Sequence, residues 1–246
     1  MKLPLGVGVC ILSSVFLTAC GNQDDDEATA SSSSSSSSSL VSGFSKHNGI
    51  YVNTDDFAFM LIDSSRTTHN LIVGDIAGKD VYLTTSGNVE NNNTYISKGL
   101  TYSDTNKFIS SSSTKMTAAF TDVAAILTGT FNDESIVYSF NKKGSNSKSL
   151  SQIAGTYTDS DTGTVWTIQS SGTLNMNGSC LVSAKLTRND SYFNLTDIAA
   201  SNCNDSSYDG EYSDGVLMTV NYKNHDYLAS VMYNQHAIIW AHVAIN

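Results

Sequence analysis

The chain of 246 residues combines 40% apolar residues with only 15% charged ones. A fully disordered chain would contain fewer apolar residues, and a coiled coil would contain far more Ala, Glu, Lys and Arg. Thirteen Lys and Arg against 23 Asp and Glu give a net charge of −10. Because phosphate neutralisation requires clustered Lys and Arg, this balance argues against a nucleic-acid partner.

The first residues have the pattern of an export signal. Lys2 supplies a positive charge, and residues 5–17 form a mostly apolar stretch. This stretch is too short to span a bilayer, which requires roughly 20 residues. It ends in Leu17-Thr18-Ala19-Cys20, followed by Gly21. The motif resembles the lipobox of bacterial lipoproteins.

The lipobox resemblance implies that residues 1–19 are removed and that Cys20 is acylated. Several acyl chains on one cysteine would anchor the protein firmly to a membrane. The next residue is Gly21 and not the Asp that resembles an inner-membrane retention signal, so we expect the outer membrane of the cell envelope. The alternative is an ordinary secretory signal that leaves Cys20 as a free thiol.

Residues 20–44 are predicted to be a flexible tether. They contain the acidic run Asp24–Glu27 and the nine serines Ser31–Ser39. Small, polar and acidic residues cannot bury enough surface to offset the entropy of the chain. The expected role is a spacer between the anchor and a folded body, although the acidic run could also be a cation site or a surface-exposure signal.

From residue 45 onward the pattern predicts an all-β body. Short runs rich in Val, Ile, Thr, Tyr and Phe alternate with clusters of Ser, Asn, Asp and Gly, which favours an antiparallel sandwich or barrel. The expected strands are Phe57–Ile62, Leu71–Ile76, Val81–Thr85, Ile126–Phe131, Ile136–Phe140, Val165–Ile168, Leu181–Leu186, Tyr192–Thr196, Val216–Tyr222, Tyr227–Tyr233 and Ala237–Val243.

A weak internal repeat suggests two related β-units in tandem, at residues 45–148 and 149–246. One offset aligns Gly49 and Tyr51 with Gly155 and Tyr157, and a different offset aligns residues 129–133 with 210–214. Chance self-similarity of a chain rich in Ser, Thr and Gly is the alternative interpretation. The Gly-x-Tyr that opens each unit resembles the Gly-x-Trp opening of lipocalin-like barrels, and the body as a whole resembles the small β-rich lipoproteins of Gram-negative envelopes.

The four cysteines predict one disulfide. Cys10 is removed with the signal and Cys20 takes the lipid, so that Cys180 and Cys203 remain to pair in an oxidising compartment. A redox-active pair is the alternative, but no Cys-x-x-Cys spacing supports it.

Motifs for enzymatic chemistry are missing from the sequence, so we expect no catalytic residues, no cofactor and no metal site. His236 and His242 share one face of an expected strand but are too far apart to hold one ion. The segment Asp159–Gly163 resembles the first part of a calcium loop without its closing Glu, and a tight turn is the preferred interpretation.

Aromatic residues in the second unit define the candidate binding surface: Tyr208, Tyr212, Tyr233 and Trp240. Rigid aromatic side chains offer contact area at a low entropic cost. The predicted function is a membrane-anchored, non-enzymatic binding module for an unidentified protein or glycan. The alternatives are an anchored inhibitor or immunity protein against an envelope-targeting enzyme, a lipocalin-like carrier and a surface hydrolase.

The substitution Cys20→Ser tests the anchor. It removes the thiol that would carry the lipid, so we expect the variant to leave the membrane fraction while the parent stays in it. Fractionation and the mass of the mature N-terminus measure this. Equal retention of both proteins, with equal N-terminal masses, would contradict the lipidation.

Overall fold

The computed structural model describes residues 43–245, and the expected signal, Cys20 and nearly all of the tether lie outside them. The described chain is almost entirely β-structure, which confirms the predicted fold class. Three single-turn helical segments interrupt it, namely η1 (Ser45–His47), α2 (Leu150–Ile153) and η2 (Ser206–Tyr208). No helix among the described residues has the length and apolarity needed to cross a bilayer.

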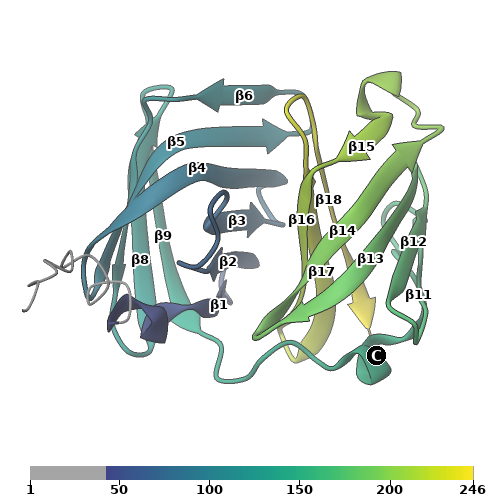
Figure 1. The fold of residues 1–246 in the computed structure, drawn as a ribbon, viewed down its shortest axis with the longest axis horizontal. Helices are drawn as coiled ribbons and strands as arrows, with labels where there is room; N and C mark the ends of the chain where they lie inside the picture. The colour runs from purple at the N-terminus through teal and green to yellow at the C-terminus, as the bar shows by residue number, and fades with distance from the viewer. Residues whose placement is uncertain (1–42, 246) are drawn as a thin grey trace, which may run out of the picture. The chain divides into compact units, whose positions relative to one another are not determined.

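The first unit is a closed antiparallel barrel (Figure 1). Its strands are β1 (Gly49–Asn53), β2 (Ala58–Ile62), β3 (Leu71–Asp75), β4 (Asp80–Asn91), β5 (Thr94–Asp104), β6 (Phe108–Ser111), β7 (Met116–Phe120), β8 (Ala124–Phe131) and β9 (Glu134–Lys142). The order is β4-β3-β2-β1-β9-β8-β7-β5, and pairing of β4 with β5 closes the ring. Strand β6 pairs with β5 alongside β7.

The second unit follows the same path. Its strands are β10 (Gly155–Thr158), β11 (Val165–Ile168), β12 (Thr173–Asn177), β13 (Leu181–Asn189), β14 (Tyr192–Ser201), β15 (Gly210–Tyr212), β16 (Asp214–Tyr222), β17 (His225–Tyr233) and β18 (Ile238–Ile245). They pair in the order β10-β11-β12-β13-β14-β16-β17-β18, with β15 also on β14. Residues from all parts of this sheet share one apolar core, so the sheet curls around it.

The two units correspond strand by strand. Each is an up-and-down meander, and each has one interrupted strand, β6–β7 in the first unit and β15–β16 in the second. Gly49 pairs with Ile62 across β1 and β2, and Gly155 pairs with Ile168 across β10 and β11. The first alignment found in the sequence therefore matches equivalent positions of the two sheets.

The second alignment in the sequence is wrong. Residues 129–133 end β8 and form a tight hairpin into β9, with positive φ angles at Asn132 and Asp133. Residues 210–214 instead run from β15 into β16, and both of these strands lie along β14. The aligned residues also differ in backbone conformation, because φ is positive at Asp133 but not at Asp214, and at Gly210 but not at Gly129.

A short helical turn followed by Gly-x-Tyr occurs three times in the described chain. In each case the tyrosine hydroxyl donates to the carbonyl four residues earlier: Tyr51 to His47, Tyr157 to Ile153 and Tyr212 to Tyr208, at 2.9, 3.0 and 2.9 Å. The glycine has a φ of +138° at Gly49 and +136° at Gly210, where a side chain would be strained. The motif thus directs the chain from the turn into the strand.

The two units pack against each other through a third apolar core, the junction. Strand β2 contributes Phe59 and Leu61 to it, while Met60 of the same strand faces the barrel interior. Strand β16 contributes Met218 and Val220 in the same way. Strands buried on both faces have unbroken apolar runs, which explains why β2 and β16 lack the usual alternation.

A polar network lies at the edge of the junction. Arg66, from the β2–β3 connection, donates to Asp214 at 2.5 Å and to Asn194 at 2.9 Å. Nδ1 of His69 lies 2.6 Å from the other oxygen of Asp214. Burial alone would raise the pKa of Asp214, but the hydrogen bond from His69 and the charge of Arg66 hold that pKa below its usual value.

The substitution Asp214→Asn tests this network. The Arg66 side chain is only 11% exposed and that of Asp214 23%, so loss of the carboxylate should lower the free energy of unfolding by about 2–4 kcal/mol. Because the pKa of Asp214 is depressed, the difference should be present above about pH 4 and shrink as the pH falls further. Urea denaturation at several pH values measures it.

The control is Asp197→Asn. This variant removes a carboxylate from the ion pair with Lys185, whose side chains are 68% and 65% exposed. Exposed pairs contribute about 0–1 kcal/mol, so the control should change stability little. Equal changes in the free energy of unfolding would show that the buried network contributes no more to stability than an exposed ion pair.

Candidate functional site

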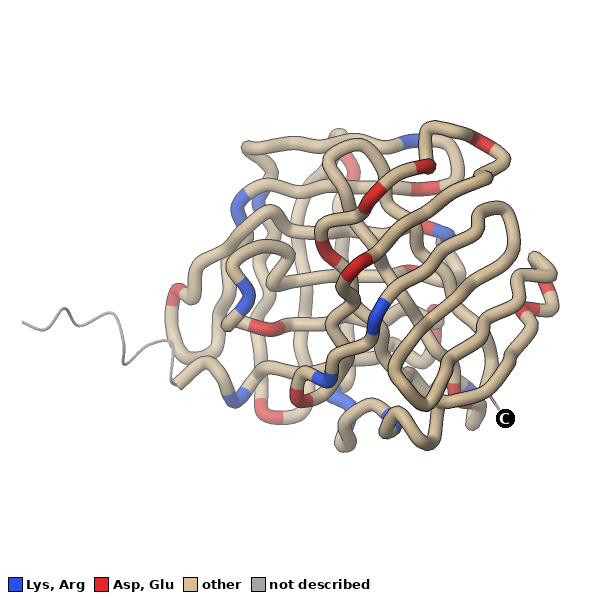
Figure 2. The backbone as a smooth tube through the Cα atoms, turned by 45° about the vertical axis from the view of Figure 1, so that its right-hand side comes forward, with Lys and Arg blue, Asp and Glu red and all other residues tan. Residues whose placement is uncertain are grey.

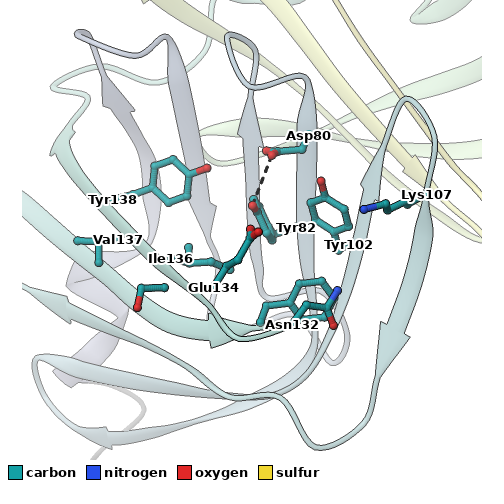
Figure 3. A pocket seen from close by; sticks show the side chains of 11 residues that line it. Asp80, Tyr82, Tyr102, Lys107, Asn132, Glu134, Ile136, Val137 and Tyr138 are labelled. Carbon is teal, nitrogen blue, oxygen red and sulfur yellow. Dashed lines mark hydrogen bonds between the residues drawn. The ribbon is translucent and has the colours of Figure 1, made fainter.

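A pocket of about 350 Å³ opens at one end of the first barrel, and we call it the barrel-mouth pocket (Figure 3). Its lining comes from β4, β5, the β5–β6 turn and the β8–β9 hairpin. The lining residues are Asp80, Tyr82, Tyr102, Lys107, Phe131, Asn132, Glu134, Ser135, Ile136, Val137 and Tyr138. The volume lies near the lower end of the range for ligand pockets, which is about 300–1,000 Å³.

The antiparallel order of the barrel explains where the pocket lies. The β3–β4, β5–β6 and β8–β9 connections all fall at the same end of the barrel, because successive strands alternate in direction. At the other end, η1 brings Phe44 and His47 against Phe120, with ring centroids 5.3 and 5.0 Å from that ring. Buried aromatic residues such as Tyr51 and Tyr95 fill the interior next to this closed end.

Three tyrosines form the wall of the barrel-mouth pocket. Strand alternation points Tyr82, Tyr102 and Tyr138 into the barrel from β4, β5 and β9. The ring of Tyr82 lies 5.2 Å from that of Tyr102 and 6.3 Å from that of Tyr138, at interplanar angles of 51° and 66°. The inclined rings thus present aromatic surface around one cavity (Figure 3).

Three carboxylates stand beside these tyrosines. Asp80 pairs with Asp75 on one neighbouring strand and with Asp104 on the other, so the three lie in a row across β3, β4 and β5. Tyr138 donates to Asp75 at 2.9 Å, Tyr102 donates to Asp104 at 2.7 Å, and Tyr82 makes a longer contact of 3.4 Å with Asp80. Each tyrosine hydroxyl therefore points at one carboxylate.

Asp80 differs from its two neighbours in having little hydrogen bonding. Asp75 also accepts from the backbone N–H of Gly78, and Asp104 accepts from those of Asn106 and Lys107. One oxygen of Asp80, Oδ1, is buried without a hydrogen-bond partner. Burial and the charges of Asp75 and Asp104 raise the pKa of Asp80 to about 6. A perturbed carboxyl group in a cavity is a recognised sign of a functional site.

Burial also raises the pKa values of the pocket tyrosines. The pKa of Tyr82 is raised to about 12, and those of Tyr102 and Tyr138 are raised as well, with the nearby aspartates adding to the effect. All three hydroxyls are therefore neutral donors at physiological pH. They can donate to a carboxylate while their oxygens remain available as acceptors.

The equivalent end of the second unit is closed. A disulfide joins Cys180, in the β12–β13 connection, to Cys203, in the β14–β15 connection. These connections correspond to β3–β4 and β5–β6 in the first unit. Both half-cystines and Tyr208 of η2 pack on the core of the second sheet. The disulfide expected from the sequence is therefore present and covers the position where the first unit has its carboxylates.

The four aromatic residues of the predicted binding surface do not lie together. Tyr212 is only 4% exposed, and it and Tyr208 contact the core inside the second sheet. Tyr233 and Trp240 lie on the opposite face, where they pack against the junction. The prediction of one exposed patch is therefore wrong: an odd or even position in the strand decides which face each residue takes, and both faces of this sheet are largely covered.

The histidines and the calcium-loop-like segment noted in the sequence have ordinary structural positions. His236 lies in the exposed β17–β18 turn, and His242 packs against Phe57 and Tyr227. The segment Asp159–Gly163 is a turn, in which Asp159 accepts from the backbone of residue 161 and from the hydroxyl of residue 162. Within residues 43–245 there is no group of three His, Cys, Asp or Glu side chains placed to hold a metal ion.

Comparisons with protein-family models, with curated proteins and with solved structures find no match to this chain. Acidic positions are spread over the described body, with basic ones interspersed among them (Figure 2). The barrel-mouth pocket combines a cavity, aromatic walls and a perturbed carboxyl group, and it is therefore the candidate functional site.

Replacement of Asp80 by Asn tests the electrostatics of the pocket. A raised carboxyl pKa means that ionisation of Asp80 destabilises the fold, so the neutral variant should be more stable above pH 6. Allowing for solvent screening, we expect a gain of about 1–2 kcal/mol in the free energy of unfolding at pH 7.5. Most of the gain should be lost at pH 4, where the folded wild-type carboxyl is protonated and the unfolded one is about half protonated.

The matched control for this experiment is Asp205→Asn. Asp205 accepts from the backbone of Ser207 in the equivalent loop of the second unit, and these bonds lower its pKa. Its replacement should therefore bring no stabilisation at pH 7.5. Urea denaturation curves at pH 4 and 7.5 provide the comparison, and a stability difference for Asp80→Asn that does not depend on pH would contradict the raised pKa.

Proposed function

We propose that the protein is a lipid-anchored envelope protein whose β-rich body is a non-enzymatic binding module, with the ligand held in the barrel-mouth pocket. The anchor is supported by the lipobox-like motif that ends in Cys20. The binding role is supported by a single observation, a cavity at one end of the first barrel where the second unit has a disulfide in the corresponding loops.

The comparison of the two units carries this proposal. Both units have the same strand order, and the β3–β4 and β5–β6 connections of the first unit correspond to the two connections that the disulfide joins in the second. The first unit instead has three tyrosines and ionisable groups around a cavity. Convergent polar groups beside aromatic side chains are what orient a ligand in a binding pocket.

A carrier of large apolar molecules fits the structure less well. Up-and-down barrels that hold such ligands keep an internal cavity. Here buried side chains such as Tyr95, Leu100 and Phe140 fill the interior of the barrel. The pocket lies at the end of the barrel and is polar, so it favours a small polar ligand or the end of a larger protein or glycan.

The substitution Glu134→Trp tests the binding role. Glu134 is exposed at the start of β9 and lines the pocket, so an indole at this position would fill the pocket with little effect on the core. A panel of small cations, anions and neutral polyols is added to the full chain, and Tm is recorded. A ligand at about 100 times its Kd should stabilise the wild type by about 2.7 kcal/mol, or several degrees, and should not stabilise the variant.

The control is Glu211→Trp, which makes the same change of charge and size at an exposed position of β15 in the second unit. It should respond to the ligand as the wild type does. If no compound stabilises the wild type, or if Glu134→Trp responds equally well, the proposed binding site is wrong.

A further inference from the structure

We propose that the barrel-mouth pocket binds a small organic ammonium ion, held between tyrosine rings and the carboxylate of Asp80. This inference rests on the proposed binding function and specifies the chemical class of the ligand. It draws on the aromatic walls, the sign of the charge and the distribution of hydrogen-bond donors around the cavity.

The aromatic walls suit a cation. The rings of Tyr82, Tyr102 and Tyr138 are inclined to one another around the cavity, and Phe131 adds a fourth ring 5.5 Å from Tyr102. Faces of aromatic rings carry negative electrostatic potential, and sites for quaternary ammonium groups are commonly built from several such rings.

The charges around the cavity are predominantly negative. Asp80 and Glu134 line it, and Asp75 and Asp104 accept hydrogen bonds from two of its tyrosines. Lys107 is the cation in the lining. Four carboxyl groups against one ammonium group favour a positive ligand over a negative one.

Among the three aspartates, Asp80 is the one with an oxygen that has no hydrogen-bond partner. Backbone N–H groups and tyrosine hydroxyls already donate to both oxygens of Asp75 and of Asp104. Asp80 has one long contact with Tyr82, and its Oδ1 has no donor. A buried carboxylate with an unpaired oxygen is unfavourable. The positive charge of an ammonium ion beside it would offset this cost.

An inorganic cation suits the pocket less well than an organic one. Calcium prefers six to eight oxygen ligands, and the carboxylates of Asp75 and Asp104 are occupied by protein donors. In the part of the chain that the structure describes, no set of three acidic or histidine side chains converges on one point. Aromatic rings also contribute nothing to the coordination of a hard metal ion.

Protons should compete with the ligand. Asp80 faces Asp75 from β3 and Asp104 from β5, with Tyr82, Tyr102 and Tyr138 around it and Lys107 and Glu134 in the pocket lining. With the Asp80 pKa at about 6, roughly a tenth of the carboxyl groups are ionised at pH 5. A ligand that requires the carboxylate should therefore bind about tenfold more weakly at pH 5 than at pH 7.5.

The experiment uses three probes of nearly equal shape and different charge. They are choline, the neutral 3,3-dimethylbutan-1-ol and the anion 3,3-dimethylbutanoate. Each is titrated into the full chain at pH 5 and pH 7.5, and binding is followed by calorimetry and by NMR signals of tyrosine side chains. We expect saturable binding of choline, at least tenfold tighter than that of the alcohol, with no measurable binding of the anion.

Three variants assign the effect to the pocket. Asp80→Asn should weaken choline binding at least tenfold at pH 7.5 and remove its pH dependence. Lys107→Gln removes the competing positive charge, so it should tighten choline binding. Asp205→Asn, which removes an equivalent turn aspartate in the second unit, should bind as the wild type does.

The outcomes separate the two proposals. Equal or tighter binding of the alcohol or the anion in the pocket would overturn the ammonium inference and leave the binding function standing. Choline binding that Asp80→Asn does not weaken would also overturn the inference. Absence of binding by all three probes would overturn the ammonium inference, and the larger panel with Glu134→Trp would then decide the binding function by itself.

Discussion

The apolar junction between the two β-units is the interaction on which the rest of the body depends. It buries the outward side chains of β1 to β4 against β14 and β16 to β18, and these strands also form the walls of the two inner cores. A strand such as β2 or β16 is therefore held from both sides. Close packing on both faces leaves no room for a shift in register, because one residue of slip would exchange the two faces. The alignment of Asp75 with Asp80, on β3 and β4, depends on this fixed register.

Much of the fold could be predicted from the sequence, because the junction strands consist almost entirely of apolar residues. The runs predicted at Phe57–Ile62, Val216–Tyr222 and Tyr227–Tyr233 match β2, β16 and β17 closely. Strand β5 does not stand out in the sequence because its buried positions include Ser97 and Ser103, which are polar. Polar residues at buried positions weaken the alternation of apolar and polar residues from which strands are predicted.

The candidate site was much harder to predict. Asp75, Asp80 and Asp104 look like ordinary turn residues in the sequence, because aspartate is common where strands begin and end. Only the pairing of β3 with β4 and of β4 with β5 brings them into a row. The clearest local signal is the spacing Asp80-x-Tyr82 and Tyr102-x-Asp104, which puts an inward tyrosine beside a carboxylate on two strands. The tyrosines of the second unit are closer together in the sequence, but in the structure they pack against the apolar cores.

The order of the strands along the chain has a consequence for assembly. The first barrel is made of one continuous segment, and its closing pairs, β1 with β9 and β4 with β5, lie entirely within that segment. A chain that emerges with its N-terminus first can complete this barrel before the second unit is available. During that interval Phe59 and Leu61 face solvent, and an exposed apolar face of this kind promotes aggregation. The short connection at residues 143–149 limits the interval, because it holds the second unit at high effective concentration next to the surface that it must cover.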